Sequence, residues 1–278
     1  MALGVRRAGY FEWQKRPKQS DRDADLVSAL KEIRKNHPCY GTQSMIDELP
    51  ENLKISYGKG YRICRDYGIL TNKRKPNGIT KSDPAAQSSE DLIKRDFYAD
   101  TPNTKLLTDI TEMQCRDGKL YLSPILDCFD GAIVGFSIDN HMKAELCEAA
   151  MQSFIKGYKG FSGCIVHSDR GSQYTSRLFR DLLAEKGFKQ SMGRTGTCSD
   201  NARMESFFAT FKKELIYRLP MYKLTRAQVR IYVFEWIAYY NRKRRHTAND
   251  GKLPPLVKRQ LYFQQMYGNF DALHSRAG

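Results

Sequence analysis

The sequence predicts a small all-α region followed by a larger α/β domain, in which helices flank a mixed five-stranded sheet. Three observations support this expectation. Short segments with helical periodicity occupy the first part of the chain. From residue 105, apolar runs separated by Asp-Gly turns give way to alternating helical and strand-like segments. A chain of 278 residues, 41% of them hydrophobic, is long enough to bury two separate cores.

A basic and aromatic segment, residues 1–22, begins the chain. Pro17 within it opposes a continuous helix, so we expect a partly ordered arm. The first helix follows this arm. Apolar residues from Leu26 to Ile33 recur at helical spacing, and Pro38 ends the pattern.

Two further short helices are predicted at residues 41–49 and 58–70. Three short helices joined by tight turns are typical of a helix-turn-helix, so we expect residues 23–84 to form a small helical DNA-binding domain. Proline, glycine, asparagine and serine are frequent in the residues that follow the third helix. This turn chemistry predicts a linker at residues 85–104.

The third helix and the segment after it are strongly basic. Arg62 and Arg65 lie three residues apart on the helix, where a recognition helix presents side chains to phosphates and base edges. Lys73 and Arg74 follow them. A solvated helix in a small bundle would carry the same pattern, so DNA contact by these four residues is a hypothesis.

Three strand-like runs begin the larger domain, at residues 105–111, 119–127 and 132–139. Asp-Gly pairs stand between apolar runs at positions 117–118 and 130–131. Such short turns join neighbouring antiparallel strands, so we expect these three runs to form an antiparallel meander.

Helices and strands then alternate along the rest of this domain. We expect, in order, a helix at about 144–156, a strand at 163–169, a helix at about 175–186, a short strand near Phe188, and helices at about 200–217 and 225–241. Three strands followed by this alternation predict an α/β fold of the ribonuclease H-like type, covering residues 105–246. The remaining residues, 247–278, are expected to form a carboxy-terminal tail.

The charge of the chain points to an acidic polymer as its partner. Lysine and arginine number 46 against 31 aspartate and glutamate residues, which gives a formal net charge of +15. The seven cysteines contain no Cys-x-x-Cys pair, so neither a zinc finger nor a disulfide framework is indicated. Free thiols, together with the lack of a signal peptide or of about 18 consecutive apolar residues, predict a cytoplasmic protein without a membrane span.

Three carboxylates are candidates for a metal-dependent site. Asp109 lies inside an apolar strand, where a charge is costly unless a cation or a polar site compensates it. Asp169 ends the apolar run 163–169, at the strand edge where α/β proteins place their sites. Glu205 lies on the helix at 200–217. Cleavage of phosphodiesters commonly uses two divalent ions held by carboxylates, so we expect these residues to hold two Mg²⁺ or Mn²⁺ ions. Three other acids border strands and are not excluded by position, namely Asp127, the reserve candidate, Asp130 and Asp139.

The helix that carries Glu205 is predicted to be amphipathic. Glu205 falls at the edge of its apolar stripe, whereas Glu214 points to the opposite side. Lys212 is two turns beyond Glu205 on the same face and is the predicted contact to DNA held at the metals. Asp200 is expected to cap this helix. The apolar stripe consists of Met204, Phe207, Phe211 and Leu215.

A second basic cluster follows the aromatic helix at 225–241. It consists of Arg242, Lys243, Arg244 and Arg245. Positive charge at the end of a helix is favourable in solution, so these residues could simply be a solvated helix end. With DNA as the expected substrate, we predict that they bind phosphates.

The motifs around the three carboxylates resemble the catalytic core of second-reading-frame insertion-sequence transposases and, more distantly, of retroviral integrases. The similar segments are TDIT around Asp109, HSDRGSQYTS around Asp169 and SDNARMESFFATFKKE around Glu205. Thirty-five residues lie between Asp169 and Glu205, which is the spacing of that family, and Lys212 matches its basic residue. The resemblance extends over nearly the whole chain.

The resemblance implies a DNA transposase that frees a 3′ hydroxyl at the ends of an insertion sequence and transfers it to another phosphodiester. It also implies double-stranded DNA as partner, both element ends and target, and a homo-oligomer assembled on that DNA. The chain could be the second frame of its element, fused by frameshifting to an upstream product.

Two alternatives stay open from the sequence. The first is a metal-dependent nuclease that hydrolyses nucleic acid without strand transfer. The second is a DNA-binding repressor derived from an inactive transposase, although the intact set of carboxylates argues against it.

Overall fold

A computed structural model describes residues 23–70, 89–193 and 198–274 of the chain, with side chains described at 23–70, 89–193 and 200–266. Contacts divide the chain into two compact units, Met1–Lys75 and Pro76–Gly278. The predicted amino-terminal arm, Lys73 and Arg74 lie outside the described residues.

Three helices form the described part of the first unit, as predicted. They are α2 (Ala24–Asn36), α3 (Thr42–Asp47) and α4 (Tyr57–Asp66), with a short 3-10 turn, η1 (Glu51–Leu53), between the last two. Leu30, Met45 and Cys64, one from each helix, are fully buried and form the centre of its core.

Helix α4 is shorter than the predicted segment 58–70 because a glycine ends it. Gly68 has a φ of +67°, in the left-handed region that favours glycine. The amide of Ile69 donates to the carbonyl of Cys64 at 2.7 Å, and the amide of Gly68 donates to the carbonyl of Arg65 at 3.2 Å. These two bonds form a Schellman motif, which terminates a helix.

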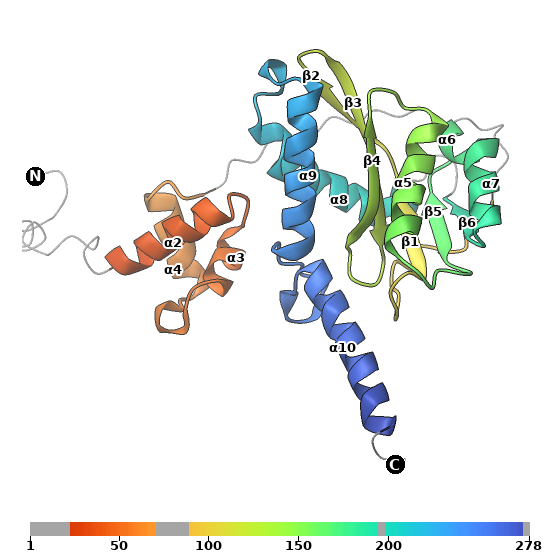
Figure 1. Ribbon diagram of the computed structural model, residues 1–278. Helices are drawn as coiled ribbons and strands as arrows, with labels where there is room; N and C mark the ends of the chain where they lie inside the picture. The colour runs from red at the N-terminus through yellow and green to blue at the C-terminus, as the bar shows by residue number, and fades with distance from the viewer. Residues whose placement is uncertain (1–22, 71–88, 194–197, 275–278) are drawn as a thin grey trace, which may run out of the picture. The chain divides into compact units, whose positions relative to one another are not determined.

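A mixed sheet forms the centre of the second unit (Figure 1). Its strand segments are β1 (Lys105–Thr108), β2 (Thr111–Cys115), β3 (Gly118–Asp127), β4 (Ile133–Asp139), β5 (Ile165–Ser168) and β6 (Lys189–Met192). Strands β3 and β4 pair antiparallel, as do β1 and β3, whereas β5 is parallel to both β1 and β6.

The first two segments act as one strand that is interrupted at its middle. Thr108 pairs with Ile125 and Thr111 pairs with Leu122, so β1 and β2 continue one register along β3. Counted in this way the sheet has the five strands that the sequence predicts, in a ribonuclease H-like arrangement. The interruption falls at Asp109.

Helices cover both faces of this sheet (Figure 1). Leu106 packs on the side of α5 (Ala144–Gly157) and α7 (Arg177–Glu185), whereas Leu107 packs on the side of α8 (Ala202–Glu214) and α9 (Arg226–Arg242). Successive strand residues point to opposite faces, which explains the two separate clusters. The short elements are α6 (Ser172–Thr175), η2 (Cys198–Asn201), η3 (Ile216–Arg218), η4 (Met221–Lys223) and η5 (Asp250–Lys252).

The carboxy-terminal segment is part of the second unit, which corrects the predicted tail at 247–278. Helix α10 (Pro255–His274) inserts Arg259 between two buried aspartates of the β3–β4 connection. Its guanidinium donates to Asp127 Oδ2 and, at 2.7 Å, to Asp130 Oδ2. Asp127, the reserve metal ligand, is therefore a structural residue, and it lies at the end of β3 away from Asp109.

The predicted linker at 85–104 is also mostly part of this unit. The amide of Leu92 donates to Ser191 Oγ at 2.9 Å, and the amide of Asn103 donates to Asp127 Oδ2 at 2.8 Å. These bonds fix the segment to the sheet at both ends. Among the helices that the structure describes, none is both long and apolar enough to cross a bilayer.

Candidate active site

Asp109 and Asp169 lie level with each other at the ends of two neighbouring parallel strands. Leu107 of β1 pairs with His167 of β5, and each aspartate stands two residues further along its strand. Because side chains alternate, Asp109 is on the same sheet face as Leu107, which packs beside α8. The sequence predicted the strand-end position of Asp169, whereas Asp109, predicted inside a strand, follows the end of β1. The parallel pairing of β1 with β5 brings the two aspartates together.

Each aspartate is oriented by a backbone amide next to it. Asp109 Oδ1 accepts a hydrogen bond from the amide of Ile110 at 2.7 Å, within the interruption between β1 and β2. Asp169 Oδ1 accepts from the amide of Gly171 at 2.9 Å, in the turn after β5. Among the described residues, the other oxygen of each carboxylate accepts no hydrogen bond and is available for a cation.

Glu205 occupies the first turn of α8 and has an exposed side chain. The predicted apolar stripe of this helix is confirmed, since Met204, Phe207 and Phe211 are buried against the sheet. Glu205 is therefore at the edge of the buried face, as its position in the helix predicted.

Electrostatics connect the three acids with Lys212. The pKa of Asp109 is raised to about 7, mainly by burial and then by the Asp169 and Glu205 carboxylates, while the amide of Ile110 and the positive charge of Lys212 act in the opposite direction. Reduced hydration likewise raises the pKa of Asp169. A cluster of carboxylates that repel one another at one end of a sheet is the kind of site that a divalent cation neutralises.

Asp109, Asp169 and Glu205 are close enough to interact electrostatically, but their carboxylates are too far apart to form a complete set of metal ligands. Within the described ranges, no three histidine, cysteine, aspartate or glutamate side chains form such a group. Glu205 is the exposed member of the three.

The raised pKa of Asp109 makes the stability of the metal-free protein depend on pH. The folded state holds the Asp109 proton more tightly than the unfolded state, so stability is lost as pH rises from about 4 to about 7. In EDTA, Asp109→Asn should therefore stabilise the protein relative to wild type more at pH 8 than at pH 5, by about 2–3 kcal/mol. Urea unfolding at the two pH values measures this, and an equal difference at both would contradict it.

Two side chains that the sequence analysis did not single out tie the start of α8 to the aspartate-bearing strands. Asn201 Nδ2 donates to the carbonyl of Thr108 at 3.2 Å, and His167 Nε2 lies 3.0 Å from the carbonyl oxygen of Asp200. The expectation that Asp200 caps α8 is wrong. Asn201 occupies the cap position, and the Asp200 carboxylate accepts from Arg95 Nε at 2.8 Å.

The predicted DNA-binding residues have different surroundings. Arg62 and Arg65 are exposed on α4, and Arg65 pairs with the neighbouring Asp66. In the second basic cluster, Arg242 and Lys243 are exposed and Arg245 is partly buried.

Arg244 has a partner within the protein. Its guanidinium makes three hydrogen bonds of 2.8–3.0 Å to the carboxylate of Glu214, at the end of α8. A DNA contact by Arg244 would have to break this bidentate pair, so the structure favours a structural role for it.

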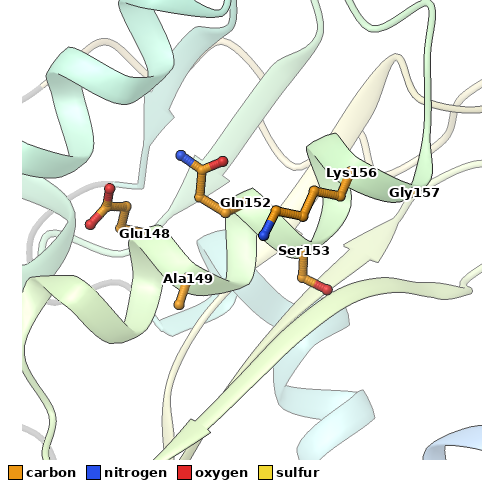
Figure 2. Close-up of a pocket in the computed structure, with 6 residues that line it drawn as sticks. All are labelled: Glu148, Ala149, Gln152, Ser153, Lys156 and Gly157. Atoms are coloured by element: carbon orange, nitrogen blue, oxygen red, sulfur yellow. The ribbon is translucent and has the colours of Figure 1, made fainter.

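An open pocket lies on the outer side of α5 and does not involve the acidic site (Figure 2). It is lined by Glu148, Ala149, Gln152, Ser153, Lys156 and Gly157. These residues all belong to one helix, which leaves the pocket shallow and without converging polar groups.

Family models match most of the second unit. An integrase core domain matches residues 99–198, a range that includes Asp109 and Asp169. A second integrase core domain model matches residues 186–255, a range that includes Glu205 and Lys212.

Curated relatives match nearly the whole chain. The 31 kDa protein of insertion element IS600 from Shigella sonnei is 34% identical over 94% of this chain and 97% of its own length. The transposase InsF of insertion sequence IS3A from Escherichia coli (strain K12) is 33% identical over 91% and 90%. A probable transposase of IS1353 from Shigella flexneri is 29% identical over 91% of this chain but only 50% of its own length.

Solved structures give a more distant likeness. The catalytic core domain of BIV integrase is 14% identical, with a TM-score of 0.45, over 60% of this chain and 99% of that chain. The assignment rests instead on the curated relatives and on the two integrase core models. On that evidence the chain belongs to the insertion-sequence transposases with an integrase core domain, and it is a DNA transposase.

Proposed function

We propose that this transposase cleaves a DNA strand at each end of its element and joins the freed 3′ end to target DNA. Asp109, Asp169 and Glu205 are the proposed catalytic and metal-binding residues. The observation that carries the proposal is the parallel pairing of β1 with β5, which sets Asp109 level with Asp169 at the ends of neighbouring strands, and the raised pKa of the buried Asp109 supports it. A buried acid among acids, at the end of a parallel strand pair, is costly in the protein alone and is stabilised by a cation.

The donor set suits hard divalent cations. Three carboxylates supply oxygen ligands, and both ring nitrogens of the neighbouring His167 are already engaged, with Ser191 Oγ and the carbonyl of Asp200. We propose two Mg²⁺ or Mn²⁺ ions at these carboxylates. When bound, such ions supply positive charge that stabilises the transition state of phosphoryl transfer and favours deprotonation of the attacking oxygen.

The reaction proceeds in two displacements at phosphorus. In the first, water attacks the phosphodiester at the end of the element, and the bond from phosphorus to the 3′ oxygen breaks, which leaves a 3′ hydroxyl. In the second, this hydroxyl attacks a phosphodiester of the target and displaces its 3′ oxygen. Asp109 and Asp169 each directly follow a strand that is paired in the sheet, and this placement would orient the reacting centre.

Lys212 is the proposed DNA contact nearest the reaction. It is partly buried on the second half of α8, and its positive charge is close enough to lower the pKa of Asp109. The exposed Arg242 and Lys243, with Arg245, and the first unit's Arg62 and Arg65, are proposed as further phosphate contacts. Lys73 and Arg74 stay sequence predictions.

Substitution of Lys212 by alanine is expected to weaken binding of element-end DNA severalfold and to lower the slope of log affinity against log salt by about one unit, because one phosphate contact is lost. Fluorescence anisotropy over a salt series measures both quantities. Lys156→Ala, an exposed lysine on the opposite face of the sheet, is the matched control and should leave the slope unchanged. Identical slopes for the two variants would remove Lys212 from the DNA interface.

A homo-oligomer on DNA, and fusion by frameshifting to an upstream product, complete the proposal. The IS1353 relative is about twice the length that this chain covers, which leaves room for such an additional part. The upstream product would add a further helix-turn-helix and an oligomerising segment, and with them specificity for the element ends.

A joining assay tests the proposed reaction. The protein is incubated with a plasmid and a duplex of the element end that is labelled at the 5′ end of the strand to be transferred, with Mg²⁺ or with EDTA. Label transferred to the plasmid only with Mg²⁺ is the expected result. Hydrolysis without transfer would favour the nuclease alternative, and binding without any cleavage would favour the repressor.

A further inference from the structure

Two buried side chains attach the start of α8 to the two strands that carry the aspartates. Asn201 reaches the carbonyl of Thr108, the residue immediately before Asp109. His167, two residues before Asp169, reaches the carbonyl of Asp200. Each strand therefore holds the beginning of the helix through one hydrogen bond, and Glu205 follows four residues after Asn201.

The hydrogen bonds around His167 define its tautomer. The carbonyl oxygen of Asp200 can only accept, so His167 Nε2 carries the proton that it donates over 3.0 Å. His167 Nδ1 then accepts from Ser191 Oγ at 2.8 Å, and Ser191 Oγ in turn accepts from the amide of Leu92 at 2.9 Å. The neutral ring thus completes a series of three hydrogen bonds that runs from the amide of Leu92, through Ser191 on β6, to the carbonyl of Asp200 before α8.

These hydrogen bonds are buried, so water cannot take the place of a lost partner. His167 and Ser191 are fully buried, and Asp200 is 2% exposed. Gly193 packs closely against the same turn, where a Cβ atom would stand 3.0 Å from the Cβ of Asp200. Loss of the histidine would remove the donor to the buried carbonyl of Asp200 and the acceptor of the Ser191 hydroxyl, and the turn would shift to replace these bonds.

We propose that His167 is a positioning residue, which with Asn201 sets the distance between Glu205 and the two aspartates. This inference rests on the proposed metal function of those three carboxylates. Glu205 lies on the first turn of α8, so a small displacement of the helix start moves its carboxylate directly. The other end of α8 is held separately, by the pair of Glu214 with Arg244. The His167 bond therefore affects the carboxylate geometry more than it affects the rest of the helix.

Two substitutions of His167 separate positioning from general stability. His167→Leu removes the donor to Asp200, whereas the amide of His167→Gln can still donate to the same carbonyl. We expect His167→Leu to weaken Mn²⁺ binding by about 10–100-fold, as changes to residues that orient metal ligands commonly do. His167→Gln should recover most of the affinity. Binding is measured on the full chain by electron paramagnetic resonance of free Mn²⁺, and the Mg²⁺ concentration that gives half-maximal cleavage should shift in parallel.

Asn241→Leu is the matched control for stability. Asn241 is buried and makes two hydrogen bonds of 2.9 Å to Ile133, which join α9 to the start of β4. The Asn241→Leu substitution should lower the thermal unfolding temperature without changing the affinity for Mn²⁺. Ser191→Ala is a milder variant in case His167→Leu does not fold, and it should weaken Mn²⁺ binding by less than the leucine variant.

The outcomes distinguish this inference from the function on which it rests. A wild-type protein that binds no Mn²⁺ would overturn the proposed metal site itself. Wild-type binding that folded His167→Leu or Ser191→Ala retains in full would overturn only the positioning role. Equal weakening by His167→Leu, His167→Gln and Asn241→Leu would also overturn it, because the effect would then follow stability rather than the donor to Asp200.

Discussion

Substitution of Asp169 by asparagine, or of Glu205 by glutamine, is expected to lower the rates of 3′-end cleavage and strand transfer by about 10³-fold, because the loss of metal-dependent charge stabilisation removes several kcal/mol from transition-state binding. Both variants keep the size and shape of the side chain, so the fold should persist. Single-turnover assays with a labelled element end, at saturating Mg²⁺, measure the two rates.

The controls for this prediction are acidic residues outside the site. Asp181→Asn and Glu185→Gln remove equal charges from exposed positions on α7 and should leave both rates close to wild type. DNA affinity should be retained by Asp169→Asn, since removal of a negative charge does not weaken attraction to phosphate. Mg²⁺-dependent activity that survives Asp169→Asn would overturn the catalytic assignment.

Arg259→Met is expected to destabilise the second unit by about 3–5 kcal/mol, because it leaves two buried carboxylates without their partner. Asp127 and Asp130 are both fully buried. Burial raises the pKa of Asp127, and the positive charge of Arg259 opposes this. Without that charge the folded state must keep an unpaired anion or take up a proton. Urea unfolding at neutral pH measures the loss.

A surface arginine provides the comparison for this second prediction. Arg177 on α7 pairs with Asp181, and its side chain is 89% exposed. Arg177→Met should change stability by no more than about 1 kcal/mol, since exposed ion pairs contribute little. If Arg259→Met unfolded at the same urea concentration as Arg177→Met, helix α10 would not be the integral element that the buried pair indicates.

Local patterns predicted most of the fold correctly. The helical spacing of apolar residues located α2, α5 and α8, and the Asp-Gly turns located the antiparallel strands. These patterns depend on which faces of an element are buried, and a short window of sequence contains that information. The same windows set the boundaries less well. The strand predicted at 105–111 continues through β2 to Cys115, because pairing with β3 resumes after the interruption at Asp109.

Residues that interact across long stretches of chain could not be found in this way. Arg259 was assigned to a tail and Asp127 to a reserve metal site, yet the two form a buried pair across 132 positions. A charged residue in a helix of mixed composition has the same local pattern whether it is solvated or buried. Only the approach of α10 to the β3–β4 connection decides between these states.

The sequence by itself determined the family, the strand-end position of Asp169 and the helix face of Glu205, because these follow from residue spacing within single elements. Asp109, predicted inside a strand, lies instead in the interruption between β1 and β2. Tertiary structure alone decided how those elements meet. The parallel register of β1 with β5 brings the aspartates level with each other, and the bonds from His167 and Asn201 hold the start of α8 beside them. Backbone carbonyls accept these bonds, and since every residue has one, no sequence pattern marks which carbonyl is used.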